Sequence, residues 1–218
     1  MIRTFREVVS ENFPYEVRRF FVPAVHKGYR LFSALVETTS FLSGFVGKNI
    51  YPYLLNVAVE FAIEEAILIN KLPIRVDRVI NPKNGHRRLE LVTPHAIMTI
   101  SQVKKEKEVP RRAVFRTQRS MNNDQLTILD DFFGELNPEQ PYYFILTHGV
   151  KESVSVGSLP EFVCLGAPEV GVRKWIDQIP LHKEPYEIIL PKEEHIEESL
   201  PKLKEEIKKG VLGNGLLK

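Results

Sequence analysis

The sequence predicts an α/β (α+β) fold with a central mixed sheet, and three observations lead to this prediction. A stretch of helical length at 52–70 is almost wholly apolar, and polar and apolar residues then alternate in short runs over 74–103. A change of period from about 3.6 to 2 marks the passage from helix to strand. Two further short apolar runs, at 142–147 and 161–165, extend the sheet. Helices on both sides of a group of strands are typical of a mixed α/β or α+β domain.

Two helices are expected ahead of the strands. The first covers 31–47, and the glycines near its end, Gly44 and Gly47, are expected to stop it. The second covers 52–70, where Pro52 suits the first helical turn. Because apolar residues cover nearly all of the second helix, we expect it to be buried on most sides.

One polar stripe interrupts this apolar helix. Asn56, Glu60 and Glu64 recur every four residues and therefore share one face. A buried helix usually keeps one stripe in water, which is the simpler interpretation. The alternative is that Glu60 or Glu64 supports a metal ion in a neighbouring site.

Three strands are expected next, at 74–80, 87–92 and 96–103. Residues 81–85 (Asn-Pro-Lys-Asn-Gly) have the composition of a tight turn, and residues 93–95 (Thr-Pro-His) form a second short connection. Strands joined by such short turns pair as antiparallel neighbours, so this segment predicts a three-stranded meander over about 74–103.

The rest of the chain predicts shorter elements and a charged end. These are a helix at 124–133, strands at 142–147 and 161–165, a helix at 172–178 around Trp175, a strand at 186–190, and a charged helix at 191–209 interrupted at Pro201. We expect 1–190 to be a single α/β domain, with its core at 31–150 and an N-terminal extension at 1–30. The remaining residues, 191–218, are expected to form the charged helix and a mobile tail.

Composition and missing motifs limit the classes of function. The 218 residues are 43% hydrophobic and 27% charged, the usual mix of a folded soluble domain. A single cysteine, Cys164, excludes a disulfide framework and a cysteine-based zinc site. No P-loop, dinucleotide fingerprint or H-E-x-x-H is present, which disfavours nucleotide-driven motors, Rossmann oxidoreductases and zinc enzymes. Carboxylates within 53–69 argue against a membrane span, and the start of the chain lacks a leader-like apolar run, so a cytoplasmic location is expected.

A candidate catalytic pattern lies at the end of the third expected strand. Gln102 and Lys104 are two residues apart, so their side chains leave the same face of a strand. Glu90 lies on the preceding strand, across a short turn and opposite residues 99–101. We therefore expect Glu90 to lie within one pleat step of Gln102.

This pattern resembles the core of the PD-(D/E)XK (restriction-endonuclease-like) nuclease superfamily. The order helix, strand, strand, strand, helix, strand is similar, and some members have Gln in the first place of the tripeptide. The resemblance implies a Mg²⁺-dependent hydrolase of phosphodiester bonds. It implies Glu90 as the strand acid and metal ligand, Gln102 as the second ligand, and Lys104 as the residue beside the attacking water. Glu60 or Glu64 would support the metal, and the sequence departs from the family in having Glu rather than Asp on the strand.

A basic stretch follows the meander. Seven basic and two acidic side chains give residues 103–119 a net charge of +5. The basic residues are Lys104, Lys105, Lys107, Arg111, Arg112, Arg116 and Arg119, and Arg87 and Arg88 of the neighbouring hairpin add to them. Arginine forks suit phosphate oxygens, and Phe115 among them can stack on a base, so the stretch predicts nucleic acid as the partner, DNA more than RNA. The alternative is an edge strand that charge protects against aggregation.

Three functions stay open on the sequence. The first is a metal-dependent DNA nuclease or a degenerate nuclease-like DNA binder. The second is a non-enzymatic regulator or inhibitor of phage or mobile-element type, which binds DNA or a partner protein through 104–119. The third is an oligomeric structural protein, for example a homodimer formed through an exposed sheet edge. His148 at a strand end is a further candidate active-site position, whereas Cys164 is expected to be a core residue.

Overall fold

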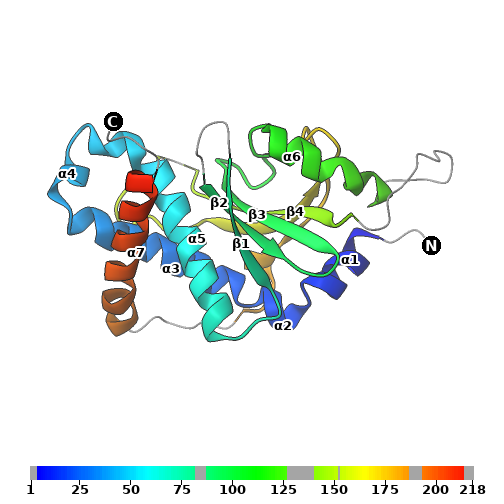
Figure 1. Cartoon of the computed structure of the whole chain (residues 1–218), viewed down its shortest axis with the longest axis horizontal. Helices are drawn as coiled ribbons and strands as arrows, with labels where there is room; N and C mark the ends of the chain where they lie inside the picture. Colours follow the sequence, from blue (N-terminus) through cyan, green and yellow to red (C-terminus); the bar gives the residue numbers. More distant parts are fainter. Residues whose placement is uncertain (1–3, 82–86, 127–139, 152, 187–192, 214–218) are drawn as a thin grey trace.

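The central feature of the molecule is a six-stranded mixed sheet with helices packed against it (Figure 1). The computed structural model describes residues 4–81, 87–126, 140–151, 153–186 and 193–213. The strands follow one another across the sheet in chain order, and β3 and β4 are parallel whereas the other neighbouring pairs are antiparallel. The predicted α/β class and the meander of the first three strands are confirmed.

The six strands and the main helices have the following bounds. The strands are β1 (Arg75–Ile80), β2 (Arg87–Val92), β3 (Ala96–Gln102), β4 (Tyr142–Gly149), β5 (Phe162–Pro168) and β6 (Trp175–Pro180). The α-helices are α1 (Phe5–Asn12), α2 (Tyr15–Arg18), α3 (Phe21–Glu37), α4 (Ser40–Ser43), α5 (Tyr51–Ile69), α6 (Val114–Arg119) and α7 (Glu193–Gly213). Three 3₁₀ turns are η1 (Gly47–Ile50), η2 (Ser120–Leu126) and η3 (Leu181–Lys183).

The two faces of the sheet are covered unequally. One face, here called the core face, carries the main hydrophobic cluster, to which α1, α3 and α5 contribute; Met98, Ile100 and Phe144 of the sheet belong to it. The opposite face, called the α6 face, lies against α6 and η2 and holds a smaller cluster that includes Ile97 and Tyr143. Because side chains alternate along a strand, these clusters show to which face each strand residue points.

Helix α5 is the predicted apolar helix, and it packs closely against α3. At Gly28 of α3 a Cβ atom would lie 2.6 Å from Cα of Val59, so only glycine permits this approach. The charged helix α7 packs against both α3 and α5, with Leu203 fully buried. None of the helices in the described ranges combines the length and the apolar character needed to cross a bilayer.

Residues 4–30 contribute to the main core. Thr4 and Glu7 form a capping box that begins α1, since the Thr4 hydroxyl accepts from the Glu7 N–H and the Glu7 carboxylate accepts from the Thr4 N–H. Phe5 and Phe13 are buried and pack on Phe144 of β4, with ring centroids 6.0 and 5.8 Å apart. This segment was expected as an N-terminal extension, and it instead covers one end of the core face.

Two of the expected helices before and after the sheet have different bounds in the structure. The helix expected at 31–47 begins earlier, at Phe21, and ends at Glu37, ahead of the glycines that were expected to stop it. Its early start was hidden by Pro23, which is tolerated because it lies in the first turn. Helix α7 continues through Pro201, which was expected to interrupt it.

The prediction of a helix at 172–178 is wrong, because Trp175–Pro180 forms strand β6. Gly171 and Val172 have φ values of 84° and 56°, which make the tight turn that returns the chain beside β5. The Trp175 ring then lies so close to Gly166 that a Cβ there would be 2.7 Å from the ring. Residues 127–133 of the helix expected at 124–133, most of the strand expected at 186–190, and the tail 214–218 lie outside the described residues.

Candidate functional site

A cleft opens where β2 separates from β3. The two strands pair at Leu91–Met98 and Val92–Ile97, next to their turn, and no further pair is formed between residues 87–92 and 96–102. The separation leaves a cleft of about 720 Å³. Its walls come from α5 (Tyr53, Asn56 and Glu60), β2 (Arg88), the end of β3 (Thr99 to Gln102) and the start of α6 (Ala113 to Arg116).

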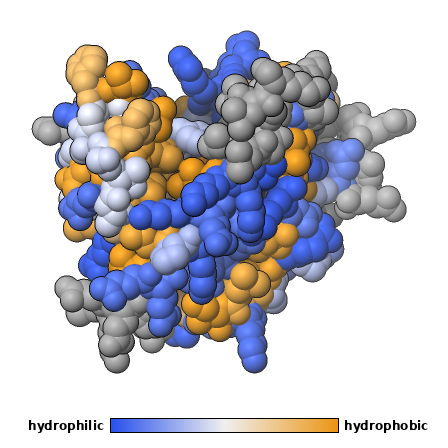
Figure 2. Space-filling model, turned by 60° about the vertical axis from the view of Figure 1, so that its left-hand side comes forward, coloured by the Kyte–Doolittle hydropathy of each residue, from blue (hydrophilic) through white to orange (hydrophobic). Residues whose placement is uncertain are grey.

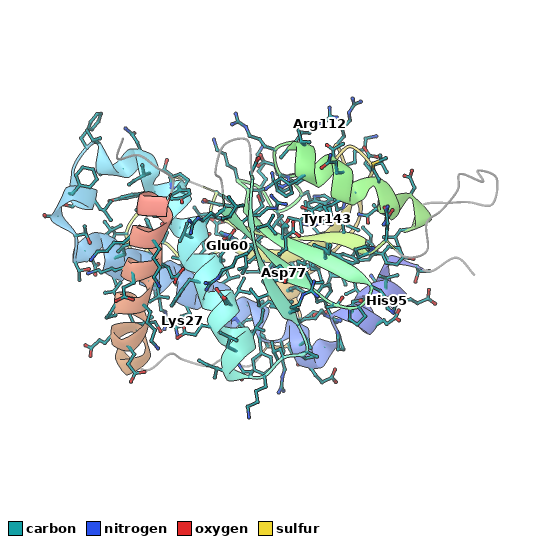
Figure 3. All side chains as sticks on the ribbon, in the orientation of Figure 1. Lys27, Glu60, Asp77, His95, Arg112 and Tyr143 are labelled. Carbon is teal, nitrogen blue, oxygen red and sulfur yellow. The ribbon has the colours of Figure 1, made fainter. Side chains whose placement is uncertain are left out.

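Glu60 fills the place of the missing β2–β3 hydrogen bonds. Its carboxyl group accepts from the backbone N–H of Leu89 and, at 2.9 Å, from Nδ2 of Asn56. Burial raises the pKa of Glu60 to about 8, and the nearby Glu64 carboxylate adds to the increase. Glu60 is therefore mostly protonated at neutral pH, and the stripe expected to face water turns one of its members toward the sheet (Figure 3).

Glu90 lies on the other side of β2, where two arginines bind it. Its side chain is 2% exposed, and Oε1 accepts from Nε of Arg88 at 2.9 Å. The second oxygen, Oε2, accepts from Nη2 of Arg119, also at 2.9 Å. Both oxygens are thus occupied by cationic donors, which is what a buried carboxylate needs to remain charged.

The structure does not bring Glu90 and Gln102 together, and the expected pairing is wrong. Leu89 and Leu91, the neighbours of Glu90, lie in the cluster of the core face, so Glu90 points to the α6 face. Gln102 has the parity of Met98 and Ile100 and therefore points to the core face, where it lines the cleft with Glu60. The sequence held a signal for this outcome. A two-residue turn at Pro94–His95 pairs Leu91 with Met98, which sets Glu90 against residue 99 and on the opposite face from residue 102.

The arginines of the α6 face gather around one aromatic ring. The guanidinium carbon of Arg88 lies 4.2 Å, and that of Arg116 5.0 Å, from the ring centroid of Phe115. Arg116 also donates to the carbonyl of Arg111 at 2.7 Å and to Ser101 Oγ at 3.3 Å. Phe115 was expected to stack on a base, and here two guanidinium groups lie against it instead.

A loop rich in exposed cations leaves the cleft at Gln102 and returns to it at Ala113. Its exposed basic side chains are Lys104, Lys105, Lys107, Arg111 and Arg112, and Figure 3 shows Arg112 at the outer edge of the molecule beside α6. The turn that begins this loop is fixed by Glu108, whose carboxylate accepts the backbone N–H groups of Lys104 and Lys105 at 3.0 and 3.2 Å. Arg87 on the hairpin is exposed as well. We call residues 104–112 the basic loop.

The residues implied as magnesium ligands do not fit a Mg²⁺ ion. Glu90 has both oxygens bound to arginines and faces away from Gln102. Glu64 pairs with Arg78 at 2.9 Å and lies outside the cleft wall, and Glu60 is bound to Asn56 and to the backbone of Leu89. Mg²⁺ requires ionised or neutral oxygen donors arranged around one point, and these three carboxyl groups have separate partners. Lys104 is exposed beyond the end of β3 and does not line the cleft.

His148, which the sequence placed at a strand end, is a core residue. It is fully buried on β4, its Nδ1 lies 3.1 Å from the Tyr29 hydroxyl, and burial lowers its pKa to about 3. A histidine that stays neutral across the physiological range and does not reach the cleft is a packing group.

Sequence reasoning missed two features of the cleft. Tyr53, 52% exposed on its rim, was not among the candidate site residues, and the bond from Leu89 to Glu60 depends on a strand separation that periodicity does not reveal. No protein-family model, curated protein or solved structure matches this chain. The site is therefore interpreted from its own geometry and charge.

Proposed function

We propose that this protein binds nucleic acid along the basic loop and the adjoining cleft, without cleaving it through a metal ion. The observation that carries the proposal is the five exposed cations of the basic loop, which begins and ends at the wall of one cleft. Exposed lysines and arginines in a continuous run bind a phosphate backbone, and the released counterions make the affinity fall with salt. Figure 2, which brings the side of α4 and α7 forward, shows a broad band of hydrophilic residues between apolar patches on that face of the molecule.

The cleft suits a nucleobase or a nucleotide. A volume of about 720 Å³ lies in the range of small-molecule sites. Tyr53 on its rim offers an aromatic surface, and bases stack on such side chains with little regard to sequence. Asn56, Gln102 and the protonated Glu60 supply donors and acceptors for a base edge.

The nuclease alternative is supported by the order of the elements and opposed by the site. In the described residues the order is α5, β1, β2, β3, α6 and β4, although α6 lies at Val114–Arg119 and not at the helix expected at 124–133. The implied catalytic residues are dispersed, with Glu90 on one face and Gln102 on the other. A nuclease-like binder that lacks the metal ligands is the form of the first hypothesis that this geometry favours.

A salt titration of binding tests the proposal. Fluorescence anisotropy with labelled single- and double-stranded DNA should show an affinity that falls steeply as salt rises. Changing Lys104, Lys105 and Lys107 together to Gln should make the negative slope of log affinity against log salt shallower by about 2 to 3. The matched control changes three exposed lysines elsewhere, Lys71, Lys202 and Lys208, to Gln and should leave the slope unchanged. Equal losses in the two triple variants, or no salt dependence at all, would remove the basic loop from the proposal.

A cleavage assay separates binding from catalysis. We expect plasmid DNA to stay intact with Mg²⁺ or Mn²⁺ in the presence of the wild-type protein and of Glu90→Gln. Metal-dependent cleavage by the wild type that is lost in Glu90→Gln would restore the nuclease hypothesis.

Self-association is a second candidate, favoured by one apolar patch. Phe41, Phe45 and Val46, around α4 and η1, are 64%, 89% and 65% exposed. Exposed aromatic side chains that lie together are typical of contact surfaces. If this patch joins two copies into a homodimer, sedimentation velocity should show a dimer that Phe45→Asp converts to a monomer and that salt does not dissociate.

A further inference from the structure

Three side chains with metal-binding atoms meet at a place remote from the cleft wall. One ligand atom each of Glu106, Cys164 and His182 lies within 4.8 Å of the other two. They come from the basic loop, from β5 and from η3, so the sheet and its connections bring them together across long stretches of sequence. Cys164 is fully buried, and Glu106 and His182 are partly exposed.

The histidine is oriented as in a metal site. Nδ1 of His182 lies 3.1 Å from the carbonyl oxygen of Val163, and Nε2 lies 3.8 Å from Oε1 of Glu106. The N–H of Val163 also points to Nδ1, at 3.4 Å, so Nδ1 can accept from this N–H or, when it carries the proton, donate to the Val163 carbonyl and leave Nε2 free. A ligand histidine usually donates its second ring N–H to a carbonyl or carboxylate, which leaves the other nitrogen for the ion.

We propose that Glu106, Cys164 and His182 form a binding site for a Zn²⁺-class divalent ion, although the single cysteine was expected to exclude such a site. Thiolate, imidazole and carboxylate together are ligands that zinc accepts, and Zn–S and Zn–N bonds of about 2.3 and 2.0 Å put tetrahedral ligand atoms roughly 3.3–3.8 Å apart. The three ligand atoms lie within 4.8 Å of one another, so closing to that spacing needs side-chain shifts of up to about 1–1.5 Å. The thiol proton passes to solvent when the ion binds, and a water completes the tetrahedron.

One cation competes with the ion for this site. Nζ of Lys183 lies 3.3 Å from the same Glu106 oxygen, Oε1, that faces His182. Removing Lys183 frees the carboxylate and removes a nearby positive charge, so it should strengthen metal binding rather than weaken it. Stronger metal binding without Lys183 is expected of a metal site. If the three residues formed only an ion-pair cluster, removing Lys183 would weaken the cluster and would not promote metal binding.

Metal binding would also fix the basic loop. The backbone carbonyl of Glu106 already accepts from Nε2 of Gln178 on β6 at 3.0 Å. An ion held by Glu106 adds a second attachment between this loop and the sheet. The site stands independently of the proposed nucleic-acid binding, because its ligands are not the residues proposed to contact phosphate.

Cobalt absorption and zinc calorimetry test the proposal on the full chain under reducing conditions. Co²⁺ should give tetrahedral visible bands together with a near-ultraviolet thiolate-to-cobalt band, and Zn²⁺ should displace it. Cys164 is the single cysteine of the chain, so a thiolate band identifies that residue. Cys164→Ala should abolish the band, and His182→Gln and Glu106→Gln should each weaken Zn²⁺ binding by at least about tenfold.

Two control variants make the result decisive. His95→Gln alters an exposed histidine on the β2–β3 turn and should leave Zn²⁺ affinity unchanged, while Lys183→Gln should raise it. His182→Gln and Glu106→Gln lie at partly exposed positions, so they remain informative if the buried Cys164→Ala variant fails to fold. Cobalt binding without a thiolate band, or the same loss of Zn²⁺ affinity in His95→Gln as in His182→Gln, would overturn the proposal.

Discussion

Glu60 and Glu90 lie on opposite sides of the same strand and have partners of different charge. Glu60 approaches β2 from α5 and finds a backbone N–H and an asparagine amide, both neutral donors, and burial raises its pKa to about 8. Glu90 projects from β2 into the α6 face and accepts from two cationic donors, Arg88 and Arg119. Two carboxyl groups of one type therefore meet different electrostatic environments on the two sides of one strand.

Exposed cations, rather than the carboxylates Glu60 and Glu90, are the charged groups that a partner can reach. Glu90 neutralises part of the charge of Arg88 and Arg119, and Glu60 adds none at neutral pH. The exposed cations of the basic loop thus retain their charge next to a cleft that lacks an opposing anion of its own. An anionic polymer is the partner that this balance favours.

The largest effect is expected from neutralising Glu90. Glu90→Gln leaves Arg88 and Arg119 without their counter-charge, and breaking a buried ion pair on one side costs about 3 kcal/mol or more. Urea denaturation should show a loss of this size in the free energy of unfolding. The control is Asp77→Asn, the cross-strand neighbour of Glu90, whose pair with Arg75 is exposed and should cost less than about 1 kcal/mol. Similar losses in the two variants would contradict the charged state of Glu90.

Glu60 should make stability fall as pH rises. Its pKa is about 8 in the folded protein against an ordinary 4.5, so between these values the folded state binds more protons than the unfolded state. The free energy of unfolding should decrease by up to about 1.4 kcal/mol per pH unit over this window, with the full contribution present below pH 4.5. Glu60→Gln should flatten this dependence and be more stable than the wild type at pH 9, as urea denaturation at several pH values would show. The control, Glu205→Gln on the exposed side of α7, should leave the pH dependence of the free energy of unfolding unchanged. The same pH dependence in Glu60→Gln as in the wild type would mean that a group other than Glu60 causes it.

Tyr53 should contribute to nucleic-acid affinity at the rim of the cleft. Tyr53→Ala removes one stacking surface, worth about 1–3 kcal/mol per base, so anisotropy should show an affinity loss of roughly 5- to 160-fold. Tyr15→Ala, an exposed tyrosine on α2, is the control and should bind as the wild type does. An unchanged affinity in Tyr53→Ala would confine binding to the basic loop.

The smallest effect is expected from a single lysine of the basic loop. Lys105→Ala should lower the slope of log affinity against log salt by about 1, since one phosphate contact is lost. Anisotropy over a range of salt measures the slope, with Lys71→Ala as the control. A change of slope in Lys71→Ala as large as that in Lys105→Ala would mean that net charge alone, and not this loop, determines binding.

Much of the fold could be predicted from the sequence because its signals are local. The apolar run of α5 and the alternation of β1, β2 and β3 each lie within twenty residues, and short turns leave few ways to pair such strands. The exposure of the basic loop could also be predicted, because lysines and arginines without partners are rarely buried and therefore remain in water.

By itself, then, the sequence determined the helix α5, the meander and the charge of the basic loop. The tertiary structure alone decided the separation of β2 from β3, the burial of Glu60 at Leu89 and the meeting of Glu106, Cys164 and His182. Strand separation depends on how α5 packs against the sheet, and a ligand cluster depends on residues up to 76 positions apart, as from Glu106 to His182. Local periodicity gives the direction of each side chain from its own backbone, but packing between distant elements decides which partner it meets there.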